Sequence, residues 1–333
     1  MNKDIDDIFS ISNEEKIIKK VKNDRKKLNL KICIISVISV LIIITLCNLS
    51  LSFLSNKYID KQFYKNLDIK TIEFQVKYPN KFISKQNYIE TGYFKFQSTY
   101  EISKKIGNRL LYAGSSNEVN NISKTINTKD SYLTNGKHEV LSSDINNRTD
   151  DTYGLRKLYF LYPYVNYENT INDFNFLNDI DKNKIVEMSL SFDKQYNYEQ
   201  INNLINSNLI TFYWVDDNDN EGKKYCINNK WYENEDSIIG IKSIFYNGSN
   251  LTDINDRLNK FKDSINYFKD NWNPNINSDI NLDDIKINGV VVIGTPDELK
   301  TLQNYSIIKL SIIGSVVDRY LILLNFFCIG HKK

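Results

Sequence analysis

The sequence predicts a single-pass membrane protein in which one transmembrane helix precedes a large α+β extracytoplasmic region. Three observations support this fold class. No residue between Ile32 and Asn56 is charged, and lysine and arginine are concentrated just before this apolar run. After the run, about 275 residues carry strand-like and helix-like patterns, which is enough chain for one large domain or two ordinary ones. We expect a β-rich first half and a mixed βαβ-type sandwich in the second half.

The apolar run predicts a transmembrane helix over Ile32–Leu54. A helix over the uncharged stretch is roughly 37 Å long, and the hydrocarbon core of a bilayer is about 30 Å thick. A buried core helix is disfavoured because every face of the run is apolar or small and lysines flank both ends. A cleaved signal peptide is disfavoured because the run exceeds the usual ~7–15 residues and no small-residue cleavage site follows it. Ser36, Ser39 and Ser52 face lipid or, alternatively, a second membrane partner or the other subunit of a homodimer.

The charges on either side of the run predict its orientation. Eight lysines and arginines lie between residues 16 and 31, whereas the lysines after the run alternate with Asp60 and Asp68. Basic residues next to a membrane segment stay in the cytoplasm. We therefore expect the N-terminus on the cytoplasmic side of the plasma membrane and residues 57–333 on its extracytoplasmic side. Residues 1–31 hold nine basic and six acidic side chains, a local charge that already exceeds the net +2 of the chain. Nothing outside the membrane therefore indicates nucleic-acid binding.

Residues 1–31 predict a cytoplasmic helix-forming segment. Ser12 and Glu15 have the spacing of a capping box. Ile17, Val21 and Leu28 then fall near one helix face, with Ile18 beside them. One interpretation is a basic helix that lies on the inner leaflet as an anchor. The other is a docking helix for a cytosolic protein.

The extracytoplasmic sequence divides into two predicted regions. Residues 58–180 are β-rich, with alternating strands at "TIEFQVK" (71–77) and "TGYFKFQSTY" (91–100), a buried strand at "LYFLYPY" (158–164), and a polar loop over 114–155. Residues 181–330 form the α+β domain. Its predicted strands and helices are "KIVEMSLSF" (184–192), a short helix capped by Asn197, "LITFYWV" (209–215), a helix over 254–268, "IKINGVVVIG" (285–294), a helix begun by Thr295, Pro296 and Glu298, and "SIIKLSIIGSVVD" (306–318). The apolar tail 320–330 is too short to span a bilayer.

Motifs for catalysis, cofactors or metals are lacking, so we expect neither an enzyme nor a cofactor protein. The sequence has two histidines, His138 and His331, and neither lies near a candidate nucleophile in the chain. No glycine-rich phosphate loop and no zinc-ligand spacing occurs. "DDNDNEGKKYCIN" (216–228) resembles a calcium loop, but position 12 holds Asn228 and a polar hairpin turn between strands explains it better. Cys226 and Cys328 lie outside the membrane, where they either pair or stay free.

Several phrases resemble a known family. "YFLYPYVNY" (159–167), "KIVEMSLSFDKQYNYEQINNLI" (184–205), "TFYWV" (211–215) and "INGVVVIGTPDELKTLQNYSIIKLSIIGSVVDRY" (287–320) resemble the C-terminal domain of the sigma factor regulator anti-sigma proteins. The segment "KVKNDRKKLNLKICIISVISVLIIITLCNLSLSF" with the strands after it looks like the N-terminal domain of that family. The resemblance implies a single-pass Firmicutes membrane protein that holds an extracytoplasmic-function sigma factor inactive and whose external domain influences release.

The resemblance favours the docking interpretation of residues 1–31. Many anti-sigma factors grip sigma with a folded cytosolic domain, whereas the residues before the run contain neither His nor Cys. A helix laid in a groove of sigma is therefore the expected mode of binding. The candidate partner-binding residues are Ile5, Ile8, Phe9, Ile17, Ile18 and Val21. The alternative function is a membrane-tethered extracytoplasmic binding or envelope-associated protein without a role in transcription.

Overall fold

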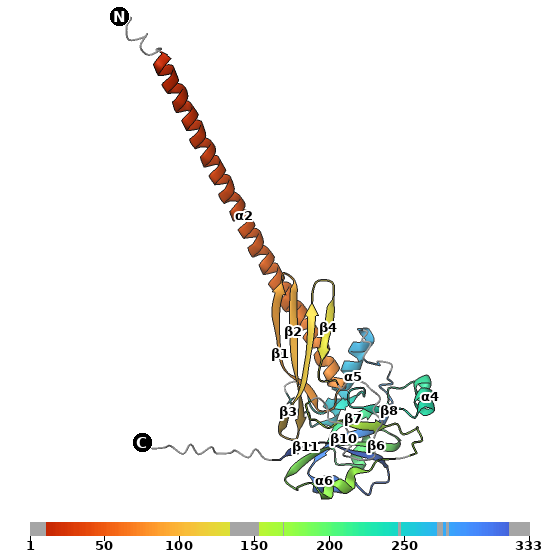
Figure 1. Cartoon of the computed structure of the whole chain (residues 1–333). Coiled ribbons are helices and arrows are strands. Elements are labelled where there is room, and N and C mark those ends of the chain that lie inside the picture. Colours follow the sequence, from red (N-terminus) through yellow and green to blue (C-terminus); the bar gives the residue numbers. More distant parts are fainter. Residues whose placement is uncertain are drawn as a thin grey trace, which may run out of the picture. The chain divides into compact units, whose positions relative to one another are not determined.

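A computed structural model of the chain describes residues 11–133, 153–168, 170–245, 248–271, 276–277 and 280–319, without the side chains of residues 11–13 and 129 (Figure 1). The chain divides into two compact units. The first unit consists of Met1–Lys61 and Gly92–Phe94, and the second unit consists of Gln62–Thr91 and Lys95–Lys333. The long helix α2 (Ile11–Val76) contributes residues to both units.

Helix α2 contains the predicted membrane span. In the described part of the chain it is the one helix that is long and apolar enough to cross a membrane, and the side chains of its apolar stretch are exposed. The hydrogen bonds within a helix pair its backbone N–H and C=O groups, so none of them faces hydrocarbon without a partner. The protein is therefore a single-pass membrane protein with a β-rich region after its one long apolar helix.

The predicted strand at residues 71–77 is wrong, because α2 continues to Val76. The alternation of Ile72, Phe74 and Val76 in "TIEFQVK" is typical of a strand. However, the side chains that α2 buries in the second unit, at Phe63, Leu67, Lys70 and Phe74, step by four, three and four residues. This spacing places them on one face of a helix, and it extends over a longer stretch than the alternation does.

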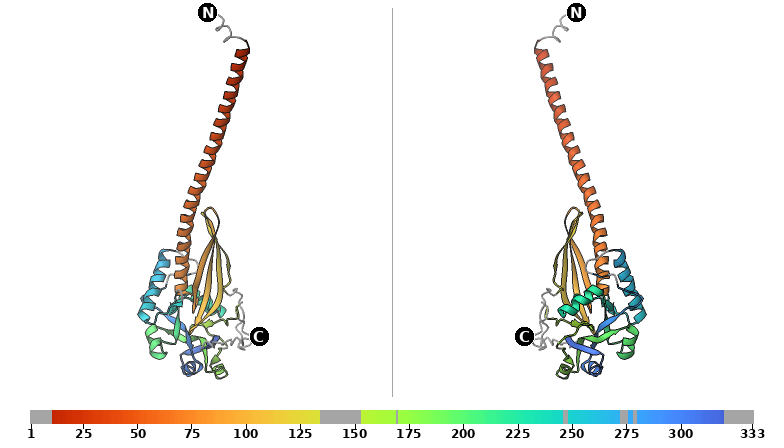
Figure 2. Two further views of the ribbon diagram at one scale, coloured as in Figure 1. Left: turned by 90° about the vertical axis from the view of Figure 1, so that its left-hand side faces the viewer. Right: turned by 90° about the vertical axis from the view of Figure 1, so that its right-hand side faces the viewer.

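The first β-sheet lies beside residues 62–76 of α2 (Figure 2). Its strand order is β1-β2-β3-β4, and its members are β1 (Lys81–Gly92), β2 (Lys95–Ile106), β3 (Arg109–Asn120) and β4 (Thr125–Asp130). The predicted strand at 91–100 is divided by a turn at Tyr93 and Phe94, and residues 114–130 of the predicted loop form the end of β3 and β4. Residues 134–152 lie outside the described residues.

The second sheet has five strands in the order β11-β6-β10-β7-β9, and its paired strands run antiparallel. They are β6 (Lys184–Tyr196), β7 (Ile210–Val215), β9 (Gly240–Lys242), β10 (Ile287–Gly294) and β11 (Ile308–Asp318). The predicted strands at 184–192, 209–215, 285–294 and 306–318 are thereby confirmed. As predicted, β6 turns one set of alternate side chains into the main core, namely Val186, Met188, Leu190 and Phe192.

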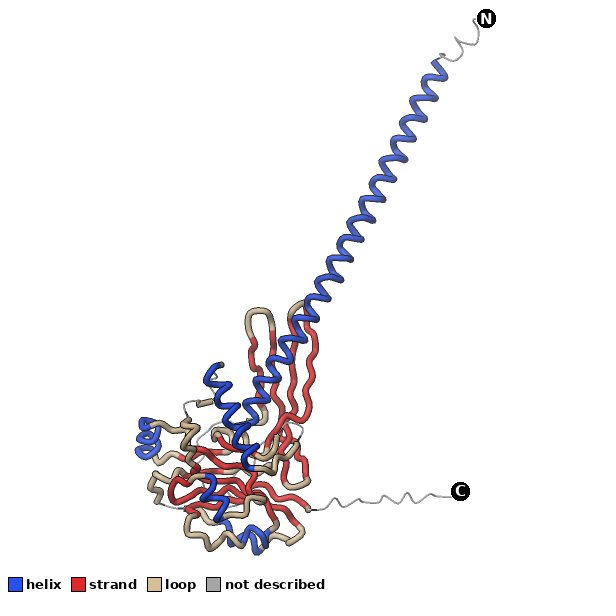
Figure 3. The backbone as a smooth tube through the Cα atoms, turned by 180° about the vertical axis from the view of Figure 1, so that it is seen from behind, coloured by secondary structure: helices blue, strands red, loops and turns tan. Residues whose placement is uncertain are grey.

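The two faces of this sheet are covered by different elements (Figure 3). Three helices bury apolar side chains against the face that carries Met188, and they are α3 (Tyr198–Leu204), α5 (Ile254–Asp270) and α6 (Pro296–Lys300). The opposite face packs Phe212 and Trp214 against the two-stranded sheet of β5 (Tyr159–Leu161) and β8 (Tyr232–Asn234). A short 3-10 helix, η2 (Asp173–Asn178), adds Phe174 to the main core.

Capping residues define the short helices. Asn197 and Thr295 form the predicted N-caps, each within a complete capping box, and Pro296 is the first residue of α6. The predicted hairpin turn at 216–228 is wrong, because α4 (Asn220–Asn229) occupies most of it. The Asp219 side chain accepts a hydrogen bond from the amide of Gly222 at 2.7 Å, which starts this helix.

Candidate functional site at the end of the long helix

The side-chain nitrogen of Lys242 contacts the C-terminal end of α2 and the chain that follows it. Lys242, the last residue of β9, is 1% exposed and donates hydrogen bonds to backbone carbonyl oxygens. The acceptors are Phe74 (2.7 Å), Lys77 (3.0 Å), Tyr78 (3.0 Å) and Lys81 (2.6 Å). Phe74 belongs to the last turn of α2, whose carbonyls have no partner within the helix, whereas the other three acceptors belong to the turn and to the start of β1. Burial, together with the charge of Lys81, lowers the pKa of Lys242 well below its usual range, and the carbonyl oxygens satisfy the hydrogen-bond donors that burial removes from water.

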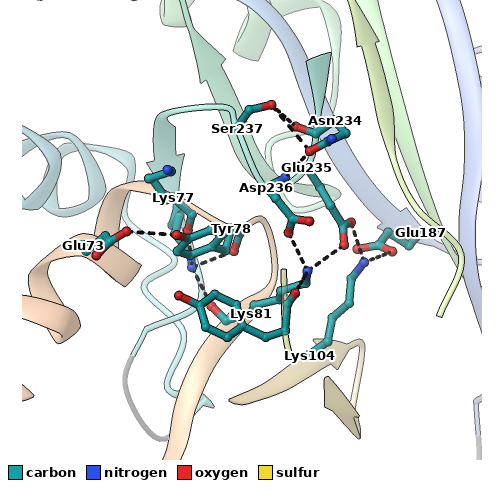
Figure 4. Close-up of polar contacts among 12 residues, drawn as sticks. Glu73, Lys77, Tyr78, Lys81, Lys104, Glu187, Asn234, Glu235, Asp236 and Ser237 are labelled. Carbon is teal, nitrogen blue, oxygen red and sulfur yellow. Dashed lines mark hydrogen bonds and ion pairs between the residues drawn. The ribbon is translucent and has the colours of Figure 1, made fainter. Parts of the chain in front are cut away.

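Two more buried lysines lie beside this end, and each is paired with carboxylates (Figure 4). The Nζ atom of Lys81 lies 3.0 Å from Glu235 and 2.8 Å from Asp236. The Nζ atom of Lys104, on β2, lies 2.8 Å from both Glu187 and Glu235. Glu235 therefore bridges the two lysines. We call Lys81, Lys104, Glu187, Glu235 and Asp236 the buried charge cluster.

The electrostatics of the cluster follow from burial and pairing. Burial alone lowers the pKa of Lys81, but the carboxylates of Asp236 and Glu235 more than reverse this effect and raise it. The pKa of Lys104 is raised in the same way by Glu187 and Glu235. For Glu187, burial raises the pKa, and the charge of Glu235 adds to this effect while Lys104 opposes it. The lysines thus remain charged, and each carboxylate is needed to offset the cost of burying them.

The chain between α2 and β1 reverses direction through a strained turn. Tyr78 and Asn80 have φ values of +57° and +61°, in the left-handed region that residues with a side chain rarely adopt. Side chains fix this conformation from both sides. The hydroxyl of Tyr78 donates to Glu73 at 2.9 Å, and the amide of Asn80 donates to Glu187 at 2.7 Å. The turn is therefore tied to both α2 and the buried charge cluster.

Polar contacts also fix the last turns of α2 to the neighbouring elements. Lys70 donates to Ser116 at 2.9 Å and pairs with Glu118 at 3.1 Å, both on β3. On α5, the hydroxyl of Ser264 donates to Gln75 at 2.9 Å. A displacement of this end of the helix would break contacts with several strands at once.

Of the predicted partner-binding residues, Ile17, Ile18 and Val21 lie on α2 in the first unit and are 59%, 54% and 46% exposed. Ile5, Ile8 and Phe9 lie outside the described residues, as do His138, His331 and Cys328. Cys226 is buried on α4, and the two alternatives for it, a bond to Cys328 or a free thiol, stay untested. Among the described residues, no group of His, Cys, Asp and Glu could hold a metal ion.

Sequence reasoning missed the buried charge cluster. One signal was present for Lys104, because it occupies an inward position of β2 in line with Tyr100, Ile102 and Ile106, which are all buried. A charged residue in such a row predicts a buried partner. The identity of that partner is a long-range property, since Lys104 and Glu235 are separated by 131 residues.

Comparison with known protein families gives two matches. The model described as sigma factor regulator N-terminal matches residues 15–110, and the model described as sigma factor regulator C-terminal matches residues 177–315. The chain belongs to the sigma factor regulator family. The matched ranges divide the buried charge cluster between them: Lys81 and Lys104 fall in the N-terminal domain of the family, and their carboxylate partners fall in its C-terminal domain. No curated protein and no solved structure matches the chain.

Proposed function

We propose that this sigma factor regulator is a membrane-anchored anti-sigma factor that sequesters an extracytoplasmic-function sigma factor. Membership of the family, joined to a single apolar helix with a folded unit at its C-terminal end, carries this proposal. The basic residues between Lys16 and Lys31 favour a cytoplasmic location for the first part of α2. The second unit then lies outside the plasma membrane.

The proposed contact with sigma is made by one face of α2 before its apolar run. Ile17 and Val21 are four residues apart, so they point in nearly the same direction, and Ile18 lies beside them. All side chains from Glu14 to Lys31 are exposed, so this face is available to a groove on a partner. Apolar side chains at this spacing are the usual anchors of a helix that binds in a groove. Burying each of them contributes about 1.5–3 kcal/mol.

In the proposed mechanism, α2 transmits a change in the second unit to this face. Lys242 contacts the C-terminal end of the helix, and the buried charge cluster holds the turn that follows it through Asn80. A stimulus that alters these contacts would change the position of α2 and so the availability of Ile17 and Val21. It can shift the equilibrium only by the difference between its affinities for the two states, about 5.5 kcal/mol for a shift from 1:99 to 99:1.

The experiment measures sigma-dependent transcription in the native host with the double variant Ile17→Asp/Val21→Asp. We expect increased reporter activity, because two buried carboxylates weaken the complex by far more than tenfold. The matched control is Lys19→Asp, which makes the same change in net charge about 160–200° away around the helix. Membrane levels of all three proteins are compared by immunoblot.

Two outcomes distinguish the proposed function from its rival. A sigma factor that co-purifies with the full chain and with Lys19→Asp, but not with the double variant, supports the anti-sigma function. Unaltered transcription in the double variant, with no sigma factor bound to the full chain, supports a tethered extracytoplasmic binding protein instead.

A further inference from the structure

The turn between β1 and β2 contacts α2 within the last part of the predicted membrane span and just beyond it. Tyr93 and Phe94 form this turn, and with Gly92 they belong to the first unit. The hydroxyl of Tyr93 donates to the side-chain oxygen of Asn48 at 3.3 Å. The backbone amide of Phe94 donates to the hydroxyl of Ser55 at 2.8 Å. Seven residues separate Asn48 from Ser55, so the turn follows about 10 Å of one helix face.

The first of these contacts satisfies a polar side chain in an apolar stretch. The amide nitrogen of Asn48 donates to the carbonyl of Ile44 at 3.0 Å, and its oxygen accepts the hydrogen bond from Tyr93. A side-chain amide that faces hydrocarbon without partners is costly. Tyr93 is nevertheless 51% exposed. Its hydroxyl contacts Asn48, while much of its side chain is not covered by the protein.

The backbone of the turn is strained in order to make these contacts. Phe94 has a φ of +57°, which is unusual for a bulky aromatic residue. Its ring packs edge-on against Tyr58 of α2, with 5.7 Å between the ring centroids. Strained backbone persists where surrounding contacts determine it, and it is concentrated at functional positions. The contacts with Ser55 and Tyr58 hold the turn in this conformation.

The surroundings have the composition of a membrane–water interface. Phe53 and Leu54 are 59% and 56% exposed on α2, and the Nζ atom of Lys57 lies 4.5 Å from the centroid of the Phe53 ring. Tyrosine is enriched where the apolar part of its ring meets hydrocarbon and its hydroxyl meets polar groups. A lysine at the depth of this interface can extend its ammonium group toward the phosphates of the lipid headgroups.

We propose that the β1–β2 turn is a membrane-interface anchor, in which Tyr93 lies in the phospholipid headgroup layer of the bilayer that α2 spans. Asn48, rather than Leu54, then marks the outer edge of the hydrocarbon. A hydrocarbon core of about 30 Å corresponds to about 20 helical residues, which extends from Cys47 back to Leu28. Lys26 and Lys27 lie just beyond that end, and Lys31 reaches the interface by extending its side chain. The proposal rests on membrane insertion of α2 and is independent of sigma binding.

The test measures the depth of a nitroxide label on the full chain in vesicles of phosphatidylethanolamine and phosphatidylglycerol. The native cysteines are first replaced (Cys33→Ser, Cys47→Ser, Cys226→Ala and Cys328→Ser), and Tyr93→Cys carries the label. Ile43→Cys is the hydrocarbon reference, and Leu110→Cys, 62% exposed near the other end of β2, is the water reference. We expect oxygen and nickel-chelate accessibilities at residue 93 that lie between the two references. Accessibilities equal to those at Leu110 or at Ile43 would overturn the proposal.

A second measurement leaves Tyr93 in place. Leu54→Cys in the same background is treated with a membrane-impermeant maleimide. With the edge of the hydrocarbon at Asn48, residue 54 lies about 9 Å beyond it, so we expect complete labelling. Protection of this cysteine to the level of Ile43→Cys would place the edge at Leu54 and contradict the proposal.

Discussion

The two ends of α2 differ in where their lysines lie. Every side chain between Glu14 and Lys31 is exposed, whereas Lys70 and Lys77 near the other end are buried. An exposed lysine keeps its water, so a contact that it makes can form and break at little cost. A buried lysine depends on its partners, and removing one of them costs several kcal/mol. The two ends of the helix thus differ in how strongly their lysines depend on partners within the protein.

The largest expected loss of stability at a buried lysine comes from Glu235→Ala. The substitution removes the carboxylate that two buried lysines share. We expect the free energy of unfolding of the second unit to fall by about 3–5 kcal/mol, because a charge is left buried without its partner. Chemical denaturation of the full chain in detergent measures it.

A matched control for Glu235→Ala is Glu101→Ala, since Glu101 pairs with the exposed Lys85. That substitution should change the free energy of unfolding by at most about 1 kcal/mol. Equal effects of the two substitutions would show that the buried end of α2 is no more firmly attached than a surface ion pair.

The next effect concerns Lys242→Met. The variant keeps the length of the side chain but leaves the carbonyls at the end of α2 without their donor, which should cost about 1–3 kcal/mol. We expect faster hydrogen exchange in residues 74–81, while exchange in α5 and β10 is little affected. Lys230→Met, which removes an exposed pair with Glu168, serves as the control and should leave this exchange unaltered.

A smaller effect should appear with pH. Burial, with the charges of Glu233 and Asp216, raises the pKa of Asp217 from 3.8 to about 7. Its contribution to stability is fully present below the unfolded pKa and is lost as pH rises through about 7. The wild-type chain should lose about 1 kcal/mol between pH 5 and pH 8, after allowance for solvent screening. In Asp217→Asn this loss should be absent, and thermal unfolding at both pH values measures the difference.

The smallest effect on stability should come from the exposed end of the helix. Ile17→Asp/Val21→Asp should change the free energy of unfolding by less than about 0.5 kcal/mol, because neither side chain packs against the fold. The same denaturation experiment measures it. A loss of several kcal/mol would mean that this end is also held in place, and the contrast between the two ends would fail.

The elements that the sequence predicts correctly are those whose pattern is local. The alternation in β6, the four-and-three spacing in α5 and the capping box of α6 are each formed by residues of a single element. The continuation of α2 to Val76 was missed because six alternating residues imitate a strand, although Phe63, Leu67 and Phe74 share a helix face. The break at Tyr93 was missed although Gly92 precedes it, because the alternation continues through Phe94 and Phe96 and the conformation of the turn depends on contacts with Ser55 and Tyr58.

The candidate site could be predicted only in part. The unusual inward position of Lys104 can be recognised in the sequence, but its pairing with Glu187 and Glu235 requires strands that are far apart in the chain. Lys242 follows a glycine and an isoleucine in a very short strand, and nothing in that local pattern indicates that it reaches the end of α2. Ile17, Ile18 and Val21 stay predictions, since their role depends on a second molecule.

The contacts of Lys242 also set an order of events during synthesis. The carbonyl of Lys81 acquires its donor from a residue made 161 positions later, and the carboxylates of the cluster also follow both of their lysines in the chain. A nascent chain that ends before residue 242 therefore lacks the donor that Lys242 supplies to the carbonyls of Phe74, Lys77, Tyr78 and Lys81. Contacts of such high sequence separation form late and slowly. The contacts that Lys242 makes at this end of α2 can therefore form only after most of the chain has been synthesised.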